Sequence, residues 1–154
     1  MIREALLSDI PEFVRIRQQP SDNPIDNAKP IPLICYQQYL TKYGKGWVHI
    51  HNNTVCGYVI SSKKESTIWA LFVEQTYQRQ GIGKALLNKA TQWLNQNGIH
   101  KIYLSTAVNS QAEQFYQHLG WHRGMPLDTG QVTYTHLYPK TNYQAVALLE
   151  KSMA

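Results

Sequence analysis

The sequence predicts a single α/β (α+β) domain with a mixed central β-sheet flanked by helices. The chain has 154 residues, which is the usual length of one domain. Hydrophobic residues make up 43% of the chain and charged residues 16%, so we expect a packed core. Segments with a strand period alternate with segments with a helical period. Their order is β-α-α-β-β-β-α-β-α-β-β, followed by a helix near the C-terminus.

The first helix is predicted from the signals at its start. A short strand over residues 2–5 precedes Ser8 and Asp9, either of which caps a helix that has Pro11 in its first turn. Residues 18–32 contain four prolines among Asp and Asn residues, so they are predicted to form a long loop. Loops of this length commonly carry function.

A second helix and three strands follow this loop. A helical period covers residues 33–43. Residues 47–51 and 55–61 flank an Asn-Asn turn and are predicted to form a hairpin. Residues 67–73 are nearly all apolar, which is typical of a central strand covered on both faces.

Two further helices and three strands make up the rest of the domain. Apolar residues at helical spacing predict a helix that begins at Ile82 and stops at Gly98. Ser110 and Glu113 match a capping box, which predicts a helix from that point. The three predicted strands are residues 99–105, 121–125 and 131–138.

We expect residues 1–138 to form the domain and residues 139–154 to form a C-terminal extension. Residues 142–151 of this extension are predicted to be helical. Their apolar stripe, at Tyr143, Val146 and Leu149, packs either on the domain or on a second copy of the chain in a homodimer.

Composition and charge exclude several classes of protein. No run of 18 apolar residues is present, so we expect no membrane partner. No apolar segment follows Met1-Ile2-Arg3-Glu4, so we expect no secretory signal, and the two cysteines are too few for a disulfide scaffold; both lead us to expect a cytoplasmic location. The net charge of +5 suits an anionic ligand. The basic residues are scattered, which argues against nucleic acid as the partner.

The segment that bears most directly on function follows the predicted strand of residues 67–73. It reads Gln78-Arg79-Gln80-Gly81-Ile82-Gly83-Lys84 and leads straight into a helix. The first turn of a helix presents unpaired N–H groups and partial positive charge, which together bind phosphate. Gly81 and Gly83 let a ligand approach the backbone, and Arg79 and Lys84 add positive charge.

Two better-known phosphate loops do not fit this segment. A Walker loop needs Ser or Thr after Gly83-Lys84, where this chain has Ala85. A dinucleotide fingerprint needs a third glycine where this chain has Leu86. For the two glycines alone, an ordinary turn without a ligand is the remaining alternative.

The wider pattern, Gln-x-x-Gly-x-Gly after an apolar strand and before Lys-Ala-Leu-Leu, resembles the acetyl-CoA motif of the GNAT superfamily of N-acetyltransferases. Asn109 and the run from Phe115-Tyr116 to Leu119-Gly120-Trp121 resemble a second motif of that family. The resemblance covers about residues 1–138. It implies transfer of an acetyl group from acetyl-CoA to a primary amine of a small molecule or a peptide, by direct attack.

The resemblance also implies which residues contact the cofactor. The pyrophosphate would lie on the backbone amides of residues 79–84, and the pantetheine arm would run along the central strand like an added strand. Asn109 and Phe115 would contact the cofactor from the next strand and helix, although core packing is an alternative role for Phe115. The implied cofactor residues are Leu71, Val73, Gln78, Arg79, Gln80, Gly81, Ile82, Gly83, Lys84, Asn109 and Phe115.

The chemistry requires a general acid, an oxyanion donor and a route for the proton of the amine. The resemblance implies that Tyr116 protonates the departing thiolate and that backbone N–H groups near Val73 stabilise the oxyanion. Some family members have a Glu where this chain has Thr67, so that base does not carry over. The alternatives for the base are Glu74, just past the strand, and a chain of water molecules.

Three expectations concern ligands other than acetyl-CoA. Asp22 and Asp26 in the long loop would attract a cationic amine, although turn formation is an alternative role for them. His49 and His51 share one face of a strand, but no cluster completes a site around them, so we expect no metal. Because the Glu at the Thr67 position is missing, a non-catalytic acyl-CoA-binding or regulatory module remains an alternative function.

Overall fold

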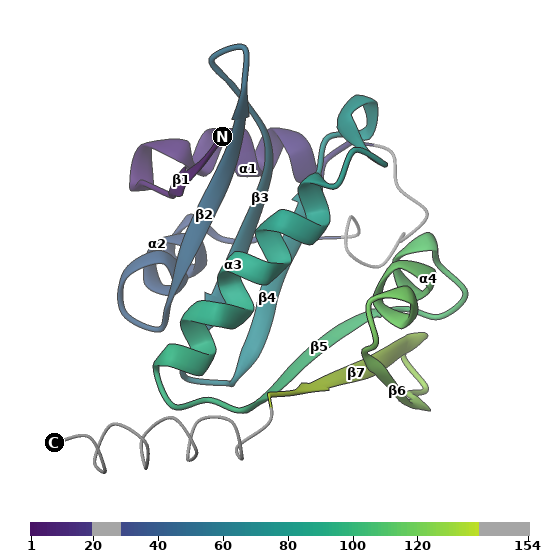
Figure 1. Cartoon of the computed structure of the whole chain (residues 1–154). Coiled ribbons are helices and arrows are strands. Elements are labelled where there is room, and N and C mark those ends of the chain that lie inside the picture. Colours follow the sequence, from purple (N-terminus) through teal and green to yellow (C-terminus); the bar gives the residue numbers. More distant parts are fainter. Residues whose placement is uncertain (20–28, 139–154) are drawn as a thin grey trace, which may run out of the picture.

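The computed structural model describes residues 1–19 and 29–138, in which a seven-stranded mixed sheet carries helices on both faces (Figure 1). The predicted fold class and the predicted order of elements are therefore confirmed for this part of the chain. Asp22, Asp26 and the extension predicted at residues 139–154 lie outside the described residues. The strands are β1 (Ile2–Glu4), β2 (Gly44–His51), β3 (Thr54–Ser62), β4 (Thr67–Val73), β5 (Lys101–Ala107), β6 (His122–Pro126) and β7 (Gln131–Leu137). The helices are α1 (Ile10–Arg17), α2 (Leu33–Thr41), α3 (Ile82–Gln96) and α4 (Gln111–His118), with short 3₁₀ helices at Leu7–Asp9 and Gln75–Tyr77.

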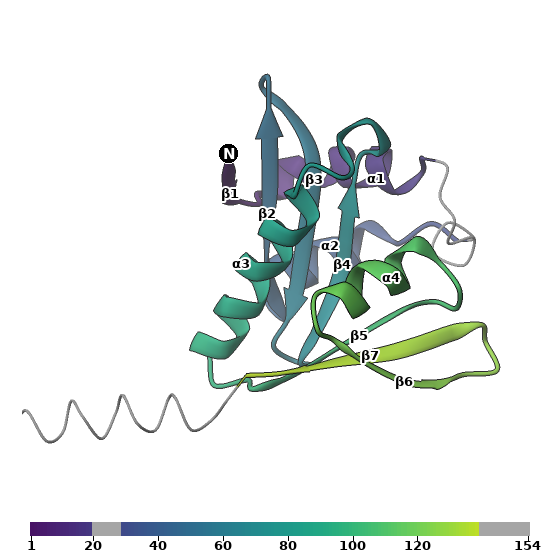
Figure 2. The ribbon, with the colours of Figure 1, turned by 45° about the vertical axis from the view of Figure 1, so that its right-hand side comes forward.

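The strand order is β1-β2-β3-β4-β5-β7-β6, and the β4–β5 pair is parallel whereas the other pairs are antiparallel. The register of β4 and β5 contains a single pair of residues, Thr67 and Tyr103. Beyond that pair the two strands diverge, as Figure 2 shows. The sheet therefore consists of an N-terminal leaf (β1–β4) and a C-terminal leaf (β5, β7 and β6) that meet at one end of β4.

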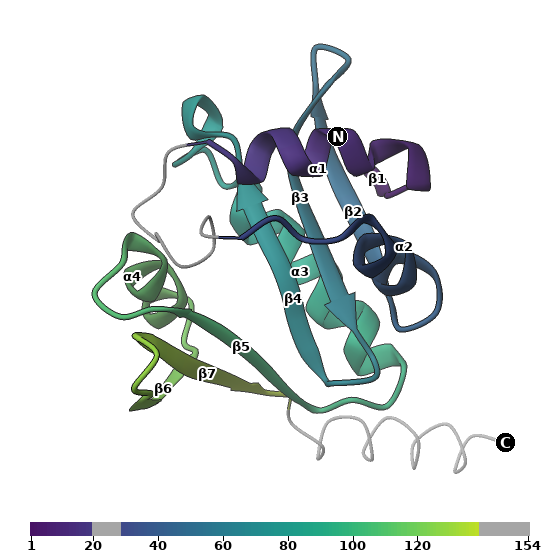
Figure 3. The same cartoon turned by 180° about the vertical axis from the view of Figure 1, so that it is seen from behind.

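Helices cover both faces of the N-terminal leaf. Helix α3 packs on β2, β3 and β4, whereas α1 and α2 lie on the opposite face (Figure 3). Under α1 and α2, the ring of Phe13 stacks on that of Tyr58 with 4.2 Å between their centroids. The core on the α3 side continues into the C-terminal leaf through Ile102 and Tyr134. Each large apolar side chain buried in this way contributes about 1.5–3 kcal/mol.

Two predicted strand boundaries were wrong, and local packing explains both. Strand β2 begins at Gly44 instead of residue 47, because glycines let this strand pass close to its neighbours. A Cβ on Gly44 would overlap with the carbonyl oxygen of Ser61. Strand β5 begins at Lys101 instead of residue 99. Gly98 at φ +85° and the bond from the Ile99 N–H to the Leu94 carbonyl (3.0 Å) extend the turn that closes α3.

Of the two predicted helix caps, one forms a cap hydrogen bond and one does not. Ser110 caps α4, since its hydroxyl oxygen accepts a hydrogen bond from the Glu113 N–H at 3.3 Å. Asp9 stands at the N-cap position of α1, but its side chain makes no cap hydrogen bond to the helix, because its carboxylate accepts from the Leu6 N–H (2.7 Å) and pairs with Arg3 (2.8 and 2.9 Å). The hydrogen bond from Arg3 holds the pKa of Asp9 below its usual value.

Candidate active site

A cavity of about 1200 Å³ lies where β4 and β5 diverge. Residues of β4 line it from both faces of the sheet. Leu71 and Val73 belong to the core on the α3 side, whereas Trp69 and Phe72 belong to the core under α1 and α2. The cavity therefore has an α3 side and an α1 side, and the gap between the two leaves joins them.

The start of α3 forms one end of the cavity. Gly81 is the N-cap at φ +82°, a left-handed conformation that favours glycine, and Arg79 is also left-handed at φ +64°. The Gln78 side-chain amide donates to the Val73 carbonyl at 3.2 Å, which ties the loop to the end of β4. A Cβ on Gly83 would lie 3.4 Å from the Phe115 ring, which is an ordinary contact, so a small side chain fits at this position.

Most of the predicted cofactor residues lie around this one cavity, and three do not. Ile82 is only 7% exposed and packs in the core, Gln80 points to solvent, and Asn109 is outside the lining. The predicted residues that line the cavity are Leu71, Val73, Gln78, Arg79, Gly81, Gly83, Lys84 and Phe115.

Tyr116 lines the same cavity and is held among aromatic rings. Its residue exposure is 7%. Its ring centroid lies 5.1 Å from that of Phe115, 5.7 Å from that of Trp121 and 5.9 Å from that of Tyr134. The ring of Tyr116 is therefore fixed by contacts that do not depend on its hydroxyl group.

Glu113 anchors α4, and thereby Tyr116, to the C-terminal leaf. Its buried carboxylate accepts hydrogen bonds of 2.6 Å from the Arg123 Nε, the Tyr134 hydroxyl and the Asn109 N–H. Burial acts to raise the pKa of this carboxyl, but the three hydrogen bonds outweigh burial and hold the pKa below its usual value. Asn109 starts this turn with a left-handed backbone at φ +62°.

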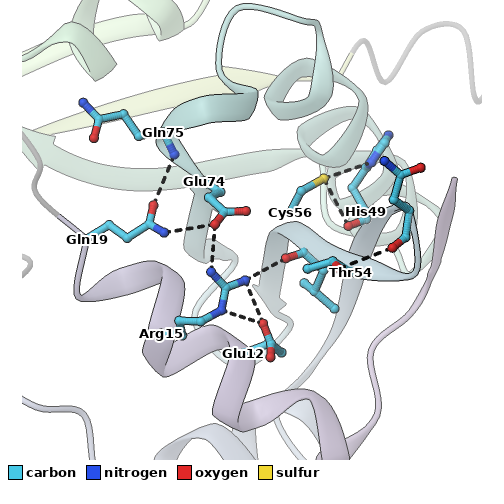
Figure 4. A network of polar contacts seen from close by, with 10 residues as sticks. Glu12, Arg15, Gln19, His49, Thr54, Cys56, Glu74 and Gln75 are labelled. Carbon is cyan, nitrogen blue, oxygen red and sulfur yellow. Dashed lines mark hydrogen bonds and ion pairs between the residues drawn. The ribbon is translucent and has the colours of Figure 1, made fainter.

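Glu74 is turned toward α1 and away from the cavity. Its carboxylate accepts from Arg15 at 2.8 Å and from the Gln19 amide at 3.2 Å, as Figure 4 shows. Gln19 also accepts from the Gln75 N–H at 3.2 Å. Val73 and Gln75 line the cavity, but Glu74 between them does not. The structure therefore does not bring the predicted base together with Tyr116.

Neither a carboxylate nor a metal cluster occurs in the described part of the site. Among residues 1–19 and 29–138, no Asp or Glu lines the cavity. Thr67 lies at the closed end of the gap, where β4 still pairs with Tyr103. No group of three potential metal ligands occurs in this part of the chain, and the His49 ring nitrogen contacts the Cys56 sulfur at 3.4 Å. None of the described helices has both the length and the apolar character needed to cross a membrane.

Several residues that line the cavity were not indicated by any sequence motif. Arg17 and Lys29 lie on the α1 side, at the two ends of the long predicted loop. Phe72 alternates with Leu71 along β4, so the strand period pointed to a second face but not to its role. Trp69 shares the face of Phe72 because the register with β3 skips it between Ala70 and Ile68, which the period did not predict. His118 lies on the last turn of α4. Their grouping depends on the divergence of β4 and β5, which has no local sequence signal.

Comparison with protein families matches residues 11–121 to the acetyltransferase (GNAT) family. The GCN5-related N-acetyltransferase 2, chloroplastic, of Arabidopsis thaliana is 45% identical over 56 residues, which are 36% of this chain and 21% of that protein. The [ribosomal protein bS18]-alanine N-acetyltransferase of Haemophilus influenzae is 30% identical over 74 residues, or 47% of this chain and 51% of that protein. The matched segments thus span about half or less of these relatives.

Solved structures share the fold at low sequence identity. The ribosomal-protein-S18-alanine N-acetyltransferase of Escherichia coli has a TM-score of 0.71 at 20% identity, with 89% of this chain and 92% of that chain covered. An N-acetyltransferase of Staphylococcus aureus Mu50 has a TM-score of 0.76 at 16% identity, with 89% and 97% covered. An acetyltransferase of Bacillus anthracis, solved in complex with acetyl coenzyme A, has a TM-score of 0.71 at 18% identity, with 90% and 99% covered. Because the family model spans most of the sequence and this fold is shared, the chain belongs to the acetyltransferase (GNAT) family.

Proposed function

We propose that this chain is an N-acetyltransferase that moves an acetyl group from acetyl-CoA to a primary amine of a small molecule or a peptide. The divergence of β4 and β5 carries this proposal. It places the N-terminus of α3, an unpaired edge of β4 and the Tyr116 ring around one cavity. A separate support is the Haemophilus influenzae relative, whose name gives the amine of an alanine as acceptor.

The geometry of the cavity fits acetyl-CoA. The first-turn N–H groups of α3, beside Arg79 and Lys84, suit a pyrophosphate. Beyond Thr67, β4 has no strand partner on its β5 side in the described part of the sheet, so its backbone groups are available to the amides of the pantetheine arm. Leu71 and Val73 would flank that arm. The contact that we predicted between Asn109 and the cofactor stays a prediction.

The proposed reaction is a direct attack of the amine on the thioester. The nitrogen lone pair forms the new C–N bond, an N–H near Val73 stabilises the oxyanion, and the C–S bond then breaks. Tyr116 gives its proton to the departing thiolate. The ammonium group loses two protons overall: one goes to solvent, and the other replaces the proton that Tyr116 has given.

Water is the route that we favour for the first proton of the amine. Glu74 is engaged by Arg15 and Gln19 on the far side of the strand end, and no described carboxylate lines the cavity. The hypothesis that Glu74 is the base has its own test. If Glu74→Gln removes the acidic limb of the pH profile of kcat/KM, along which activity rises with pH, Glu74 is the base after all.

Release of free thiol from acetyl-CoA in the presence of a panel of amines tests the proposed function. The panel contains amino acids, polyamines, aminoglycosides and short peptides. We expect thiol release with at least one amine, together with thermal stabilisation by CoA. Stabilisation by CoA without thiol release from any amine would support the alternative, a non-catalytic acyl-CoA-binding module.

Several further predictions belong to this proposal. Asp22→Asn combined with Asp26→Asn is expected to raise the KM for the acceptor and to leave CoA affinity unchanged, because the two carboxylates would attract the ammonium group. A cytoplasmic location is supported by Cys35 and Cys56, which are both free thiols. We expect no nucleic-acid partner, and sedimentation of the full chain will decide between a monomer and a homodimer.

A further inference from the structure

The charged side chains that line the cavity are all basic in the part of the chain that the structure describes. Arg79 and Lys84 stand at the start of α3, and Arg17 and Lys29 stand on the α1 side. The nearest described carboxylates do not line the cavity and are already paired, although Glu74 also accepts from Gln19, which does line it. Glu74 is paired with Arg15, and Glu113 with Arg123. The α1 side of the cavity therefore has positive charge and no described carboxylate to balance it.

Arg17 and Lys29 are brought together by one hydrogen bond. The Arg17 Nη1 donates to the Lys29 carbonyl at 3.0 Å, which holds the two ends of the long loop side by side. Arg17 is half-buried and Lys29 is exposed, and no described carboxylate forms an ion pair with either. Within residues 1–19 and 29–138, the remaining donors of Arg17 and the Lys29 ammonium therefore have no carboxylate partner that would compete with an anionic ligand.

Aromatic rings line the same cavity as these two basic residues. Trp69 on β4 stacks on Tyr39 with 4.2 Å between centroids and an interplanar angle of 8°. Its other contact is edge-on to Tyr36, at 5.6 Å and 85°. Trp69 and Phe72 line the α1 side of the cavity, so an apolar portion of a ligand can pack there while a charged group reaches Arg17.

We infer that the acceptor carries an anionic group, a carboxylate or a phosphate, and that Arg17 and Lys29 recognise it. This inference rests on the proposed function for the acceptor being an amine. It selects amino acids, amino phosphates and acidic peptides over polyamines and aminoglycosides.

A different reading would assign Arg17 and Lys29 to the phosphates of CoA. The fold argues against this reading, because α3 and the α1–α2 pair cover opposite faces of the N-terminal leaf (Figures 1 and 3). Arg79 and Lys84, at the start of α3, are the basic residues placed to meet a pyrophosphate. The two readings differ in one measurable quantity, the affinity of the double variant for CoA.

Product binding tests the inference without requiring turnover. Two matched pairs are titrated calorimetrically into the complex of the full chain with CoA. One pair is N-acetylphenylalanine and its amide, and the other is N-acetyl-O-phosphoethanolamine and N-acetylethanolamine. We expect the anionic member of at least one pair to bind about 10- to 100-fold more tightly than its neutral partner. The pair that shows the larger ratio identifies carboxylate or phosphate as the preferred group.

Two double variants test whether Arg17 and Lys29 cause the preference for the anionic product. Arg17→Gln combined with Lys29→Gln is expected to abolish the preference and to leave CoA affinity within about twofold of the parent. The matched control, Lys89→Gln with Lys101→Gln, removes two exposed charges outside the cavity and is expected to keep the preference. Lack of any preference in both pairs, including lack of binding by all four compounds, overturns the inference. It is also overturned if the preference survives in the double variant, or if that variant loses CoA affinity by clearly more than the expected factor of about two.

The proposed function and this inference fail in different ways. Absence of thiol release with every amine contradicts the proposed function, but a charge preference in product binding still supports the inference. Thiol release with a polyamine as the best acceptor supports the proposed function and contradicts the inference.

Discussion

Among the individual side chains, Tyr116 is the one on which the proposed chemistry depends most. Tyr116→Phe keeps the ring and its contacts with Phe115, Trp121 and Tyr134, and it removes only the hydroxyl group. We expect kcat to fall by roughly 10²–10⁴-fold, because a positioned acid contributes about that factor. CoA affinity and the melting temperature should stay the same. Single-turnover kinetics with a saturating amine provide the measurement.

Near-normal single-turnover rates in a folded Tyr116→Phe protein would contradict the role of Tyr116 as general acid and would leave it as a packing residue. A matched control is Tyr77→Phe, since Tyr77 also lines the cavity but lies in the short 3₁₀ helix that precedes α3. We expect this control to keep most of its activity.

Gly83 gives a second prediction for a single residue. Its added Cβ would lie 3.4 Å from the Phe115 ring and 3.7 Å from the Val73 side chain, so Gly83→Ala should fold and bind CoA. Gly83→Trp places an indole where the pyrophosphate is proposed to approach, and we expect it to lose thermal stabilisation by CoA altogether. Both variants should keep the circular dichroism of the parent. Unchanged CoA affinity in Gly83→Trp would remove the start of α3 from the cofactor site.

Helix α4 depends on the Glu113 carboxylate for its attachment, which gives the stability of the protein a particular pH dependence. The pKa of Glu113 is lower in the folded protein than its ordinary value of about 4.3. The unfolded chain therefore binds more protons below pH 4.3. The stabilisation is complete above about pH 4.3 and is lost as the pH falls from there through the folded pKa. Glu113→Gln should flatten this part of the profile and cost about 1–3 kcal/mol at pH 7.

Urea unfolding between pH 3 and pH 7 measures both effects. Glu4→Gln is the matched control, because the Glu4 side chain is 63% exposed and pairs only at the surface with Lys45. Asp9 contributes a similar acid-dependent loss in every variant, since its pKa is also lowered by Arg3. Equal slopes for Glu113→Gln and the parent would show that Glu113 does not anchor α4 as an ionised group.

The order of the elements could be predicted from the sequence because each element has a local cause. Alternating apolar residues, helix-ending glycines and the Ser110 cap act within a few residues of the chain. Two features depend on residues in other elements and could not be predicted in this way. Asp9 pairs with Arg3, which no rule for helix ends indicates. Strand β2 begins at Gly44, which is needed because the backbone of Ser61 lies too close for a side chain.

The cofactor side of the site was predictable, whereas the acceptor side was not. The cofactor side is built from one continuous segment, Gln78 to Lys84, that follows β4 directly. The α1 side combines Arg17, Lys29 and Trp69, which come from separate elements. Their proximity follows from where β4 loses its partner, and an apolar run such as that of β4 gives no sign of which edge is left unpaired.

Charge affects the molecule as a whole as well as single contacts. The chain has a net charge of +5, and its anionic cosubstrate is proposed to meet Arg79 and Lys84 at the surface. Salt screens such exposed charges, with a Debye length of about 10 Å at 0.1 M. We expect the Kd for CoA to rise several-fold between 50 and 500 mM NaCl, with a shallower dependence for Arg79→Gln. Lys89→Gln, which keeps the site charges, should follow the parent, and a Kd independent of salt would contradict this account.

The Thr67–Tyr103 pair joins the two leaves of the sheet at one end of β4, so a small rotation of one leaf about this pair would move the open end. Strand β4 rises about 3.3 Å per residue, so its far end at Val73 lies roughly 20 Å from the Thr67–Tyr103 pair. A rotation of one leaf by about 5° then shifts the open end by roughly 2 Å. A misplacement of about 1 Å can cost on the order of 10²-fold in rate. We therefore expect substitutions of side chains packed around the Thr67–Tyr103 pair to lower the rate of acetyl transfer, because they would shift the proposed acetyl donor relative to the amine.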